Sequence, residues 1–363
     1  MTLHSQPIHA SRASISRRGF LRKAGLLAPG LLVGMSAWPG RAFTALRGSQ
    51  GASVGLATRP TPIGHVGSGR PIGLIANSLS NTLIVVDARS LEPFATIPVG
   101  REPHKFHLSQ DRRTVYSCNT SSNEMIEIDL ATLRIVRHIP ILDPYNVTFT
   151  RDGRHLFKLA YRFAFVEVHD AQTFRRTKRL ETGSSPSHFA LTPDGGWFIN
   201  SNQHADTVTV IDTRAMEVAQ RLSVDPFPAG IAVSHDGRFA FVASGARGTI
   251  SAFAIGEWRL TKRMYSGKDA HEMVMTRDGS RIFVTNRGED TMSVFDVAAQ
   301  RVVEKFRVPG GPDMPMLSPD EQHLWVSGRY ANMATVVDAR TLQILTTFRT
   351  GRSPHGIFLT GSS

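Results

Sequence analysis

Three histidines and one aspartate hold the same place in a pattern that repeats along the chain. Seven residues share this place, each directly after a proline or an alanine: His104, Tyr145, Ser187, Ala229, His271, Asp313 and His355. Neutral imidazole and carboxylate are ligands of zinc, copper and non-haem iron, and a single histidine can ligate a haem iron. The pattern makes His104, His271, Asp313 and His355 a candidate metal site, for a transition metal or a haem.

Further polar side chains are expected near these four. His188 comes one position later in its own repeat, and Arg287 and Arg329 follow a second recurring place that asparagine often fills. Arginine can hold a carboxylate or phosphate with two parallel hydrogen bonds. The candidate ligand-binding residues are His104, His188, His271, Asp313, His355, Arg287 and Arg329. The alternative is that the histidines bond to exposed backbone and the arginines are solvated.

These residues recur because the whole chain is built from repeats. Segments of alternating apolar residues end at matching positions: Asp87, Asp129, Asp170, Asp212, Ala254, Asp296 and Asp338. The intervals between them are 42, 41, 42, 42, 42 and 42 residues. A regular period of this length indicates a repeat architecture.

Each repeat is predicted to contain four short antiparallel strands. Turns such as TPDG and SHDG separate the alternating runs, and Asp-Gly favours a tight hairpin because glycine accepts a positive φ. The two-fold alternation argues against helical repeats of similar length. A unit of about 42 residues with four strands is typical of a propeller blade. The predicted fold is therefore all-β, a seven-bladed β-propeller.

The two ends of the repeat region complete one blade between them. Residues 72–98 supply three strands, and residues 354–359 (PHGIFL) supply one. We expect the last blade to be closed by these N- and C-terminal strands. The first strands of the blades line the channel of a propeller, so the repeats that carry His271, Asp313, His355 and His104 should form a contiguous arc around its mouth.

The N-terminus has the features of an export signal. Arg17 and Arg18 precede Phe20 and Leu21, and a short apolar run broken by glycine and proline follows. This order resembles the twin-arginine consensus, and the run is short for a membrane span of about 20 residues. We predict a twin-arginine signal peptide over 1–42, a Gly/Ser/Pro-rich linker over 43–70 and the propeller over 71–363.

Charge and cysteine content limit the function classes. The formal charge is +12, but six of the basic residues lie within 1–42, which contain no acid, so about +6 remains for the mature chain. A mildly basic surface suits a small anionic ligand and does not imply nucleic acid. Cys118 is the one cysteine, so the core must hold by packing without an internal disulfide.

Two second-strand segments carry a family resemblance. IFVTN at 282–286 and YSCN at 116–119 resemble the YVTN repeat of propellers from the bacterial envelope, which are related to the haem domain of cytochrome cd1 nitrite reductase. The resemblance covers the chain from about residue 70 onward and implies the propeller fold. It leaves the activity open, because one fold serves many functions.

Two functions follow as expectations. The first is an exported binding module that uses one loop face for a small anionic ligand, a metal or an envelope protein partner. The second is a periplasmic redox or cofactor-handling protein with a haem or metal. A lactonase is disfavoured because no convincing Glu and Arg pair stands out, and no catalytic residue is identified. We expect a monomer in the periplasm or outside the cell, with no membrane span after signal cleavage.

Overall fold

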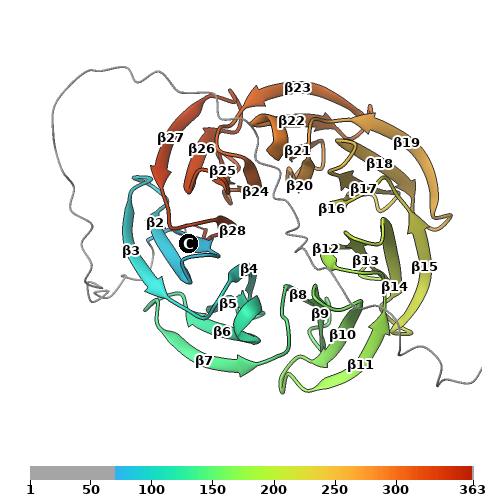
Figure 1. The fold of residues 1–363 in the computed structure, drawn as a ribbon, viewed down its shortest axis with the longest axis horizontal. Coiled ribbons are helices and arrows are strands. Elements are labelled where there is room, and N and C mark those ends of the chain that lie inside the picture. The colour runs from blue at the N-terminus through green and yellow to red at the C-terminus, as the bar shows by residue number, and fades with distance from the viewer. Residues whose placement is uncertain (1–69, 362–363) are drawn as a thin grey trace, which may run out of the picture. The chain divides into compact units, whose positions relative to one another are not determined.

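The computed structural model describes residues 70–361 of the chain. In this part, seven four-stranded antiparallel sheets follow one another around a ring (Figure 1). Hydrogen bonding runs from an innermost strand near the centre of the ring to an outermost strand at the rim. The predicted seven-bladed propeller with four antiparallel strands per blade is confirmed.

The strands are short, and most contain six residues. From innermost to outermost, the closing blade contains β28 (Pro354–Leu359), β1 (Ile72–Asn77), β2 (Thr82–Asp87) and β3 (Pro93–Pro98). The next three blades contain β4 (Pro103–Leu108), β5 (Thr114–Asn119), β6 (Glu124–Asp129), β7 (Ile135–Pro140); β8 (Asn146–Phe149), β9 (His155–Ala160), β10 (Phe165–Asp170), β11 (Arg176–Glu181); and β12 (Pro186–Leu191), β13 (Trp197–Asn202), β14 (Thr207–Asp212), β15 (Glu217–Ser223).

The last three blades complete the ring. They contain β16 (Pro228–Val233), β17 (Phe239–Ser244), β18 (Thr249–Ala254), β19 (Arg259–Tyr265); β20 (Ala270–Met275), β21 (Arg281–Asn286), β22 (Thr291–Asp296), β23 (Arg301–Arg307); and β24 (Pro312–Leu317), β25 (His323–Gly328), β26 (Met333–Asp338), β27 (Ile344–Arg349). Two short 3₁₀ helices, η1 (Thr120–Ser122) and η2 (Arg287–Glu289), follow β5 and β21.

The closing blade joins the two ends of the repeat region. β28 pairs with β1 in antiparallel register, for example Leu74 with Phe358. Figure 1 shows the red strand β28 in the same blade as the blue strands β2 and β3. The prediction that N- and C-terminal strands share one blade is confirmed.

The core lies between neighbouring blades. The middle strands of a blade are buried along most of their length, whereas the outermost strands are mostly exposed. One apolar cluster, for example, combines Phe241 and Ile250 of one blade with Ile282 and Phe295 of the next. Middle strands with apolar side chains on both faces suit this packing, because each sheet is covered on both sides.

The predicted Asp-Gly turns connect first and second strands. Gly195 has φ of 72°, and its neighbour Asp194 accepts a hydrogen bond from the Gly196 amide at 3.0 Å. Arg112 and Glu321 take the same place in two repeats without the glycine, with φ of 60° and 58°. Glycine is therefore favoured at this position and not required.

The 41-residue interval, from Asp129 to Asp170, is shortened in the loop between β7 and β8. Here the innermost strand begins at Asn146 and has four residues, so Tyr145 lies just outside it. The loop before it is fixed by buried Asp143, which pairs with Arg162 at 3.0 Å. It is also fixed by buried Lys158, whose ammonium donates to the carbonyl oxygen of Leu142 at 2.7 Å. The shortened repeat thus keeps its place in the ring through polar contacts.

The predicted signal peptide with Arg17 and Arg18, and the predicted linker except Arg70, lie outside the described residues. Within 70–361, no helix has the length and apolar character needed to cross a membrane.

Candidate metal centre

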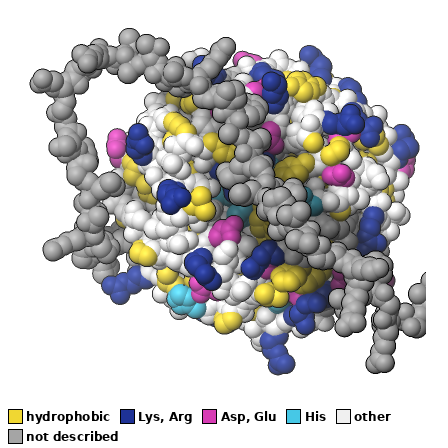
Figure 2. Space-filling view, viewed as in Figure 1, with side chains coloured by type: hydrophobic (Ala, Val, Ile, Leu, Met, Phe, Trp, Pro, Cys, Tyr) yellow, Lys and Arg dark blue, Asp and Glu magenta, His cyan; other side chains and the backbone are white. Residues whose placement is uncertain are grey.

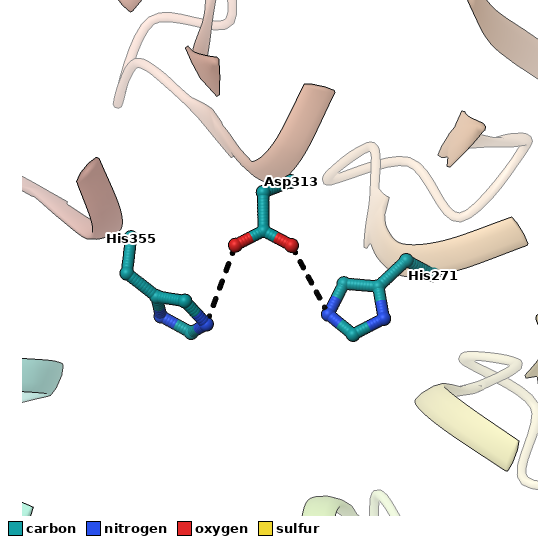
Figure 3. A group of neighbouring side chains, drawn as sticks. All are labelled: His271, Asp313 and His355. Carbon is teal, nitrogen blue, oxygen red and sulfur yellow. Dashed lines mark ion pairs between the residues drawn. The ribbon is translucent and has the colours of Figure 1, made fainter. Parts of the chain in front are cut away.

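Three of the predicted ligands meet at one side of the channel. His271, Asp313 and His355 are the second residues of β20, β24 and β28, which are the innermost strands of three consecutive blades. One donor atom from each lies within 4.8 Å of the others. Figure 3 shows the carboxylate of Asp313 between the two imidazoles, with one oxygen directed at each. The equal period of the repeats produces this layer, because it places equivalent residues at one depth.

The distances between these groups are short. Oδ1 of Asp313 is 3.3 Å from Nε2 of His271, and Oδ2 is 3.4 Å from Nε2 of His355. Asp313 and His355 are completely buried, and His271 is 3% exposed. In the view of Figure 2, histidine side chains are visible near the centre of the ring.

The tautomer of His355 is fixed by its other nitrogen. Nδ1 lies 3.0 Å from the carbonyl oxygen of His104, and a carbonyl oxygen can only accept, so Nδ1 carries a hydrogen. Burial, with the charges of Arg329 and Lys105, lowers the pKa of His355 well below its ordinary value, so the ring is neutral near pH 7. Its Nε2 therefore presents a lone pair to the Asp313 carboxylate, and it has no hydrogen-bond partner within residues 70–361.

The second imidazole is also neutral. Burial and the nearby charge of Arg287 lower the pKa of His271 well below its ordinary value. Its Nδ1 is buried without a hydrogen-bond partner in the described part of the chain. Its Nε2 is the nitrogen closer to the carboxylate.

Two arginines hold the carboxylate of Asp313. Nη1 of Arg287 donates to Oδ1, and Nη1 of Arg329 donates to Oδ2, each at 3.1 Å. Burial alone would raise the pKa of Asp313, but the surrounding positive charge holds it well below its ordinary value. Asp313 therefore stays ionised, and lone pairs on both oxygens remain for a cation.

The two arginines have fewer hydrogen-bond donors available for a ligand than the sequence suggested. Arg287 also forms two hydrogen bonds with Asp269, at 3.0 and 3.1 Å, and its side chain is 10% exposed. Arg329 has one such bond, to Asp313, and its side chain is 28% exposed. Arg329 is therefore the arginine with donors left for a ligand at the mouth.

His104 lies beside His271, Asp313 and His355 but contributes no donor atom to the group that they form. Its ring stacks on His355 with 3.6 Å between centroids, and its Nδ1 is 3.3 Å from the carbonyl oxygen of Tyr145. The structure thus brings together three of the four residues predicted to hold a metal. His104 supports His355 through its ring and its carbonyl oxygen.

His188 lies one layer deeper in the channel. Its Nε2 is 3.4 Å from Oε2 of Glu272, which in turn accepts from the ammonium of Lys105 at 2.8 Å. Lys105 and Glu272 occupy the same repeat position as His188 but were not among the predicted binding residues. Their shared register and opposite charge were the available signals for this pair.

The fold and this layer of titratable side chains define a seven-bladed propeller with a polar site at the end of its channel. The family model described as YNCE-like beta-propeller matches residues 37–362, and the chain belongs to that family. No curated protein sequence matches the chain significantly.

Several solved structures share the fold at low identity. The dihydro-heme d1 dehydrogenase NirN, solved in complex with DHE, is 17% identical over 84% of this chain and 78% of its own, with a TM-score of 0.64. The periplasmic gluconolactonase PpgL of Pseudomonas aeruginosa is 19% identical over 81% of this chain and 100% of its own, with a TM-score of 0.66. Hydrazine synthase of Kuenenia stuttgartiensis is 16% identical over 79% and 99%, with a TM-score of 0.64. The predicted resemblance to haem-domain propellers is confirmed for the fold alone.

Proposed function

We propose that this propeller is a binding protein that holds a divalent transition-metal ion through His271, Asp313 and His355. The observation that carries the proposal is the orientation of His355. Its Nδ1 donates to a backbone carbonyl, and its buried lone pair on Nε2 faces a carboxylate oxygen at 3.4 Å. Two lone pairs directed at each other repel unless a cation lies between them, and this arrangement of a histidine is the usual one beside a metal.

The donor set leaves room for a further ligand. Two imidazole nitrogens and one carboxylate give three protein ligands, and zinc or cobalt sites with three protein ligands keep an open position. Arg287 and Arg329 place two positive charges beside Asp313, which weakens the attraction for a bare dication and favours an anion in the open position. A small anion that binds the metal and pairs with Arg329 is the ligand that fits this charge arrangement.

A haem fits the same residues less well. An axial histidine must present Nε2 to an open plane, but Nε2 of His355 is buried and 3.4 Å from Asp313. The face of the His355 ring is covered by His104 at 3.6 Å. Arg287, one of the two arginines that could hold a propionate, is already bonded to Asp313 and Asp269. The contacts therefore favour a metal ion over haem.

The proposed site of action is the cell envelope. Arg17 and Arg18 before a short apolar run support export by the twin-arginine route, and PpgL, which shares the fold, is described as periplasmic. Replacing both arginines by lysine should leave the protein in the cytoplasm on cell fractionation. Equal export of the lysine variant would contradict this route.

Metal analysis tests the proposed function. The purified protein, stripped with a chelator and then titrated with zinc, cobalt or copper, should bind one equivalent per chain. His271→Ala and His355→Ala should each lower the affinity by more than about 100-fold, because losing a direct ligand costs more than losing an outer partner. His138→Ala, on exposed strand β7, is the matched control. A wild-type protein that binds none of these metals, or site variants that bind like the control, would overturn the proposal.

A further inference from the structure

A cavity lies in the channel beside Lys105, His188 and Glu272. These residues are the third of their innermost strands, whereas the residues of the candidate metal centre are the second of theirs. The volume of the cavity is about 260 Å³. One part of its lining is polar and is formed by Lys105, Asn146, His188 and Glu272. The rest is apolar and includes Phe106, Phe189, Ile231, Met273, Val274 and Ile357. A small molecule with a polar end and an apolar body matches this division.

The polar part contains an ion pair that spans the channel. Lys105 comes from β4 and Glu272 from β20, in blades that are separated by two others on the shorter way around the ring. Their charged atoms are 2.8 Å apart, and the side chains are 11% and 12% exposed. Burying an ion pair costs free energy of desolvation that the pair alone often fails to recover. A ligand that bonds to both charges would add contacts that offset this cost.

The ion pair has bonding capacity left over. The ammonium of Lys105 has three hydrogens, and its contacts within the described residues are Glu272 and the Sδ of Met314 at 3.2 Å. A thioether is a weak acceptor, so a carboxylate oxygen would replace it with a much stronger bond.

His188 supplies the independent sign of a ligand. His188 is 1% exposed and lines the cavity, and its Nε2, although 3.4 Å from Oε2 of Glu272, forms no hydrogen bond within residues 70–361. Nδ1 lies 3.0 Å from the hydroxyl of Ser187, which can donate to it and leave a hydrogen on Nε2. A buried donor that makes no hydrogen bond is costly, and an acceptor atom of a ligand in line with this N–H bond would satisfy it.

We infer that this cavity binds a small zwitterion, an α-amino acid with an apolar side chain. Its carboxylate would accept from Lys105 and His188, and its ammonium would donate to Glu272. The argument is one of charge balance. A simple carboxylate would leave two negative groups beside one ammonium, and a simple amine would leave two positive groups beside one carboxylate. A zwitterion adds one of each, so every buried charge keeps an opposite neighbour.

The volume is large enough for a whole amino acid. A water molecule needs about 10–15 Å³ of such space, so the cavity of about 260 Å³ has room for leucine or methionine. Their side chains would lie against Phe106, Phe189 and Ile231 on the apolar part of the lining.

Three matched compounds test the inference by isothermal titration calorimetry on the full-length protein. They are leucine, 3-methylbutylamine, which lacks the carboxylate, and 4-methylpentanoate, which lacks the ammonium. Leucine should bind, and each partial compound should bind at least about 10-fold more weakly, because each loses charge-assisted hydrogen bonds. If no compound binds, or if either partial compound matches leucine, the inference is wrong.

Variants show where the zwitterion binds. Lys105→Met and Glu272→Gln should each lower the leucine affinity about 10–100-fold, while His138→Ala should not change it. Zinc titration of the same variants separates this inference from the proposed metal site. Loss of leucine binding with retained zinc binding is expected, and leucine affinity that is unchanged in both folded variants would overturn the inference even if zinc binds.

Discussion

At the scale of single residues, the site depends on where each imidazole directs its two nitrogens. His271, His355 and His104 hold equivalent repeat positions, yet only the first two direct Nε2 at Asp313. His104 and His355 both direct Nδ1 at a carbonyl oxygen at the start of the following innermost strand, but the ring of His104 stacks on His355 and faces no carboxylate. The role of each histidine follows from whether one of its two neighbouring innermost strands carries Asp313.

The two arginines should differ in their contribution to stability. Arg287 is nearly buried and bonds to both Asp269 and Asp313, whereas Arg329 is more exposed and bonds to Asp313 alone. Arg287→Met should lower the free energy of unfolding by about 3 kcal/mol, because it strips a partner from a buried carboxylate. Arg329→Met should cost about 1 kcal/mol. Urea denaturation measures both, and equal losses would contradict this assignment.

The buried imidazole of His188 makes stability depend on pH. Burial lowers the pKa of His188 to about 4, below the ordinary value of 6.5. Between about pH 6.5 and 4, His188 therefore binds a proton in the unfolded chain and not in the folded chain. Its contribution to stability is fully present above pH 6.5 and is lost as the pH falls toward 4. The loss from this residue is at most about 1.4 kcal/mol per pH unit.

The variant His188→Gln isolates the contribution of His188 to the pH dependence of stability. Between pH 7 and 5, His188→Gln should lose less unfolding free energy than the wild-type protein does. His138→Gln removes a solvent-exposed histidine and serves as the control that should follow the wild type. Parallel losses in the wild type and His188→Gln would show that the imidazole does not titrate as described.

At the scale of elements, the close approach of two innermost strands holds the His355–His104 contact. Gly356 lies on β28, and a Cβ added there would come within 2.4 Å of the His104 carbonyl oxygen on β4. That oxygen is the acceptor of the Nδ1 hydrogen of His355. The absence of a side chain at Gly356 therefore allows the hydrogen bond that sets the tautomer.

Gly356→Ala should push β28 away from β4. We expect a loss of about 1–3 kcal/mol in unfolding free energy from overpacking, together with weaker zinc binding. Gly361→Ala is the control, because a Cβ there makes only ordinary contacts at 3.7 Å. Denaturation and zinc titration check both changes. Unaltered zinc affinity in a destabilised Gly356→Ala protein would separate this strand contact from the metal site.

The repeat register predicted more of the elements than of the contacts between them. The Asp-Gly turns and the first-strand register fixed which residues reach the channel, because strands of equal length and spacing place equivalent positions at equal depth. The partners of Arg287 could not be predicted in the same way. Asp269 lies in a loop outside the register used, and which oxygen each arginine reaches depends on side-chain packing.

At the scale of the whole molecule, the ring is closed by one strand. β28 supplies the innermost strand of the closing blade and contacts β1, β4 and β24. Its removal would expose the edge of β1 and the apolar surface that Ile357 and Leu359 cover. Because every blade packs between two others, opening one place weakens the whole ring.

Deletion of residues 354–363 should therefore unfold the protein. Circular dichroism should show loss of the cooperative thermal transition, whereas deletion of 361–363, which spares β28, should leave the melting temperature within a few degrees. A truncated protein with an unchanged melting temperature would rule out closure by β28.

The architecture as a whole followed from the sequence, whereas the contacts within the second channel layer did not. A period of 42 residues determines the number of blades. The pairing of Lys105 with Glu272 depends on which blades face each other across the channel, and on Gly230 and Gly356, whose lack of side chains leaves space at that depth. Sequence periodicity reports position around the ring and does not report which side chains meet across it.

X-ray absorption at the zinc or cobalt edge tests the central claim most directly. The metal-loaded protein should show two imidazole nitrogens and oxygen ligands at about 2.0–2.2 Å, with no sulfur. His355→Ala should lose one imidazole shell or fail to retain the metal. A spectrum with sulfur ligands, with no imidazole, or identical in wild type and His355→Ala would contradict a metal centre at His271, Asp313 and His355.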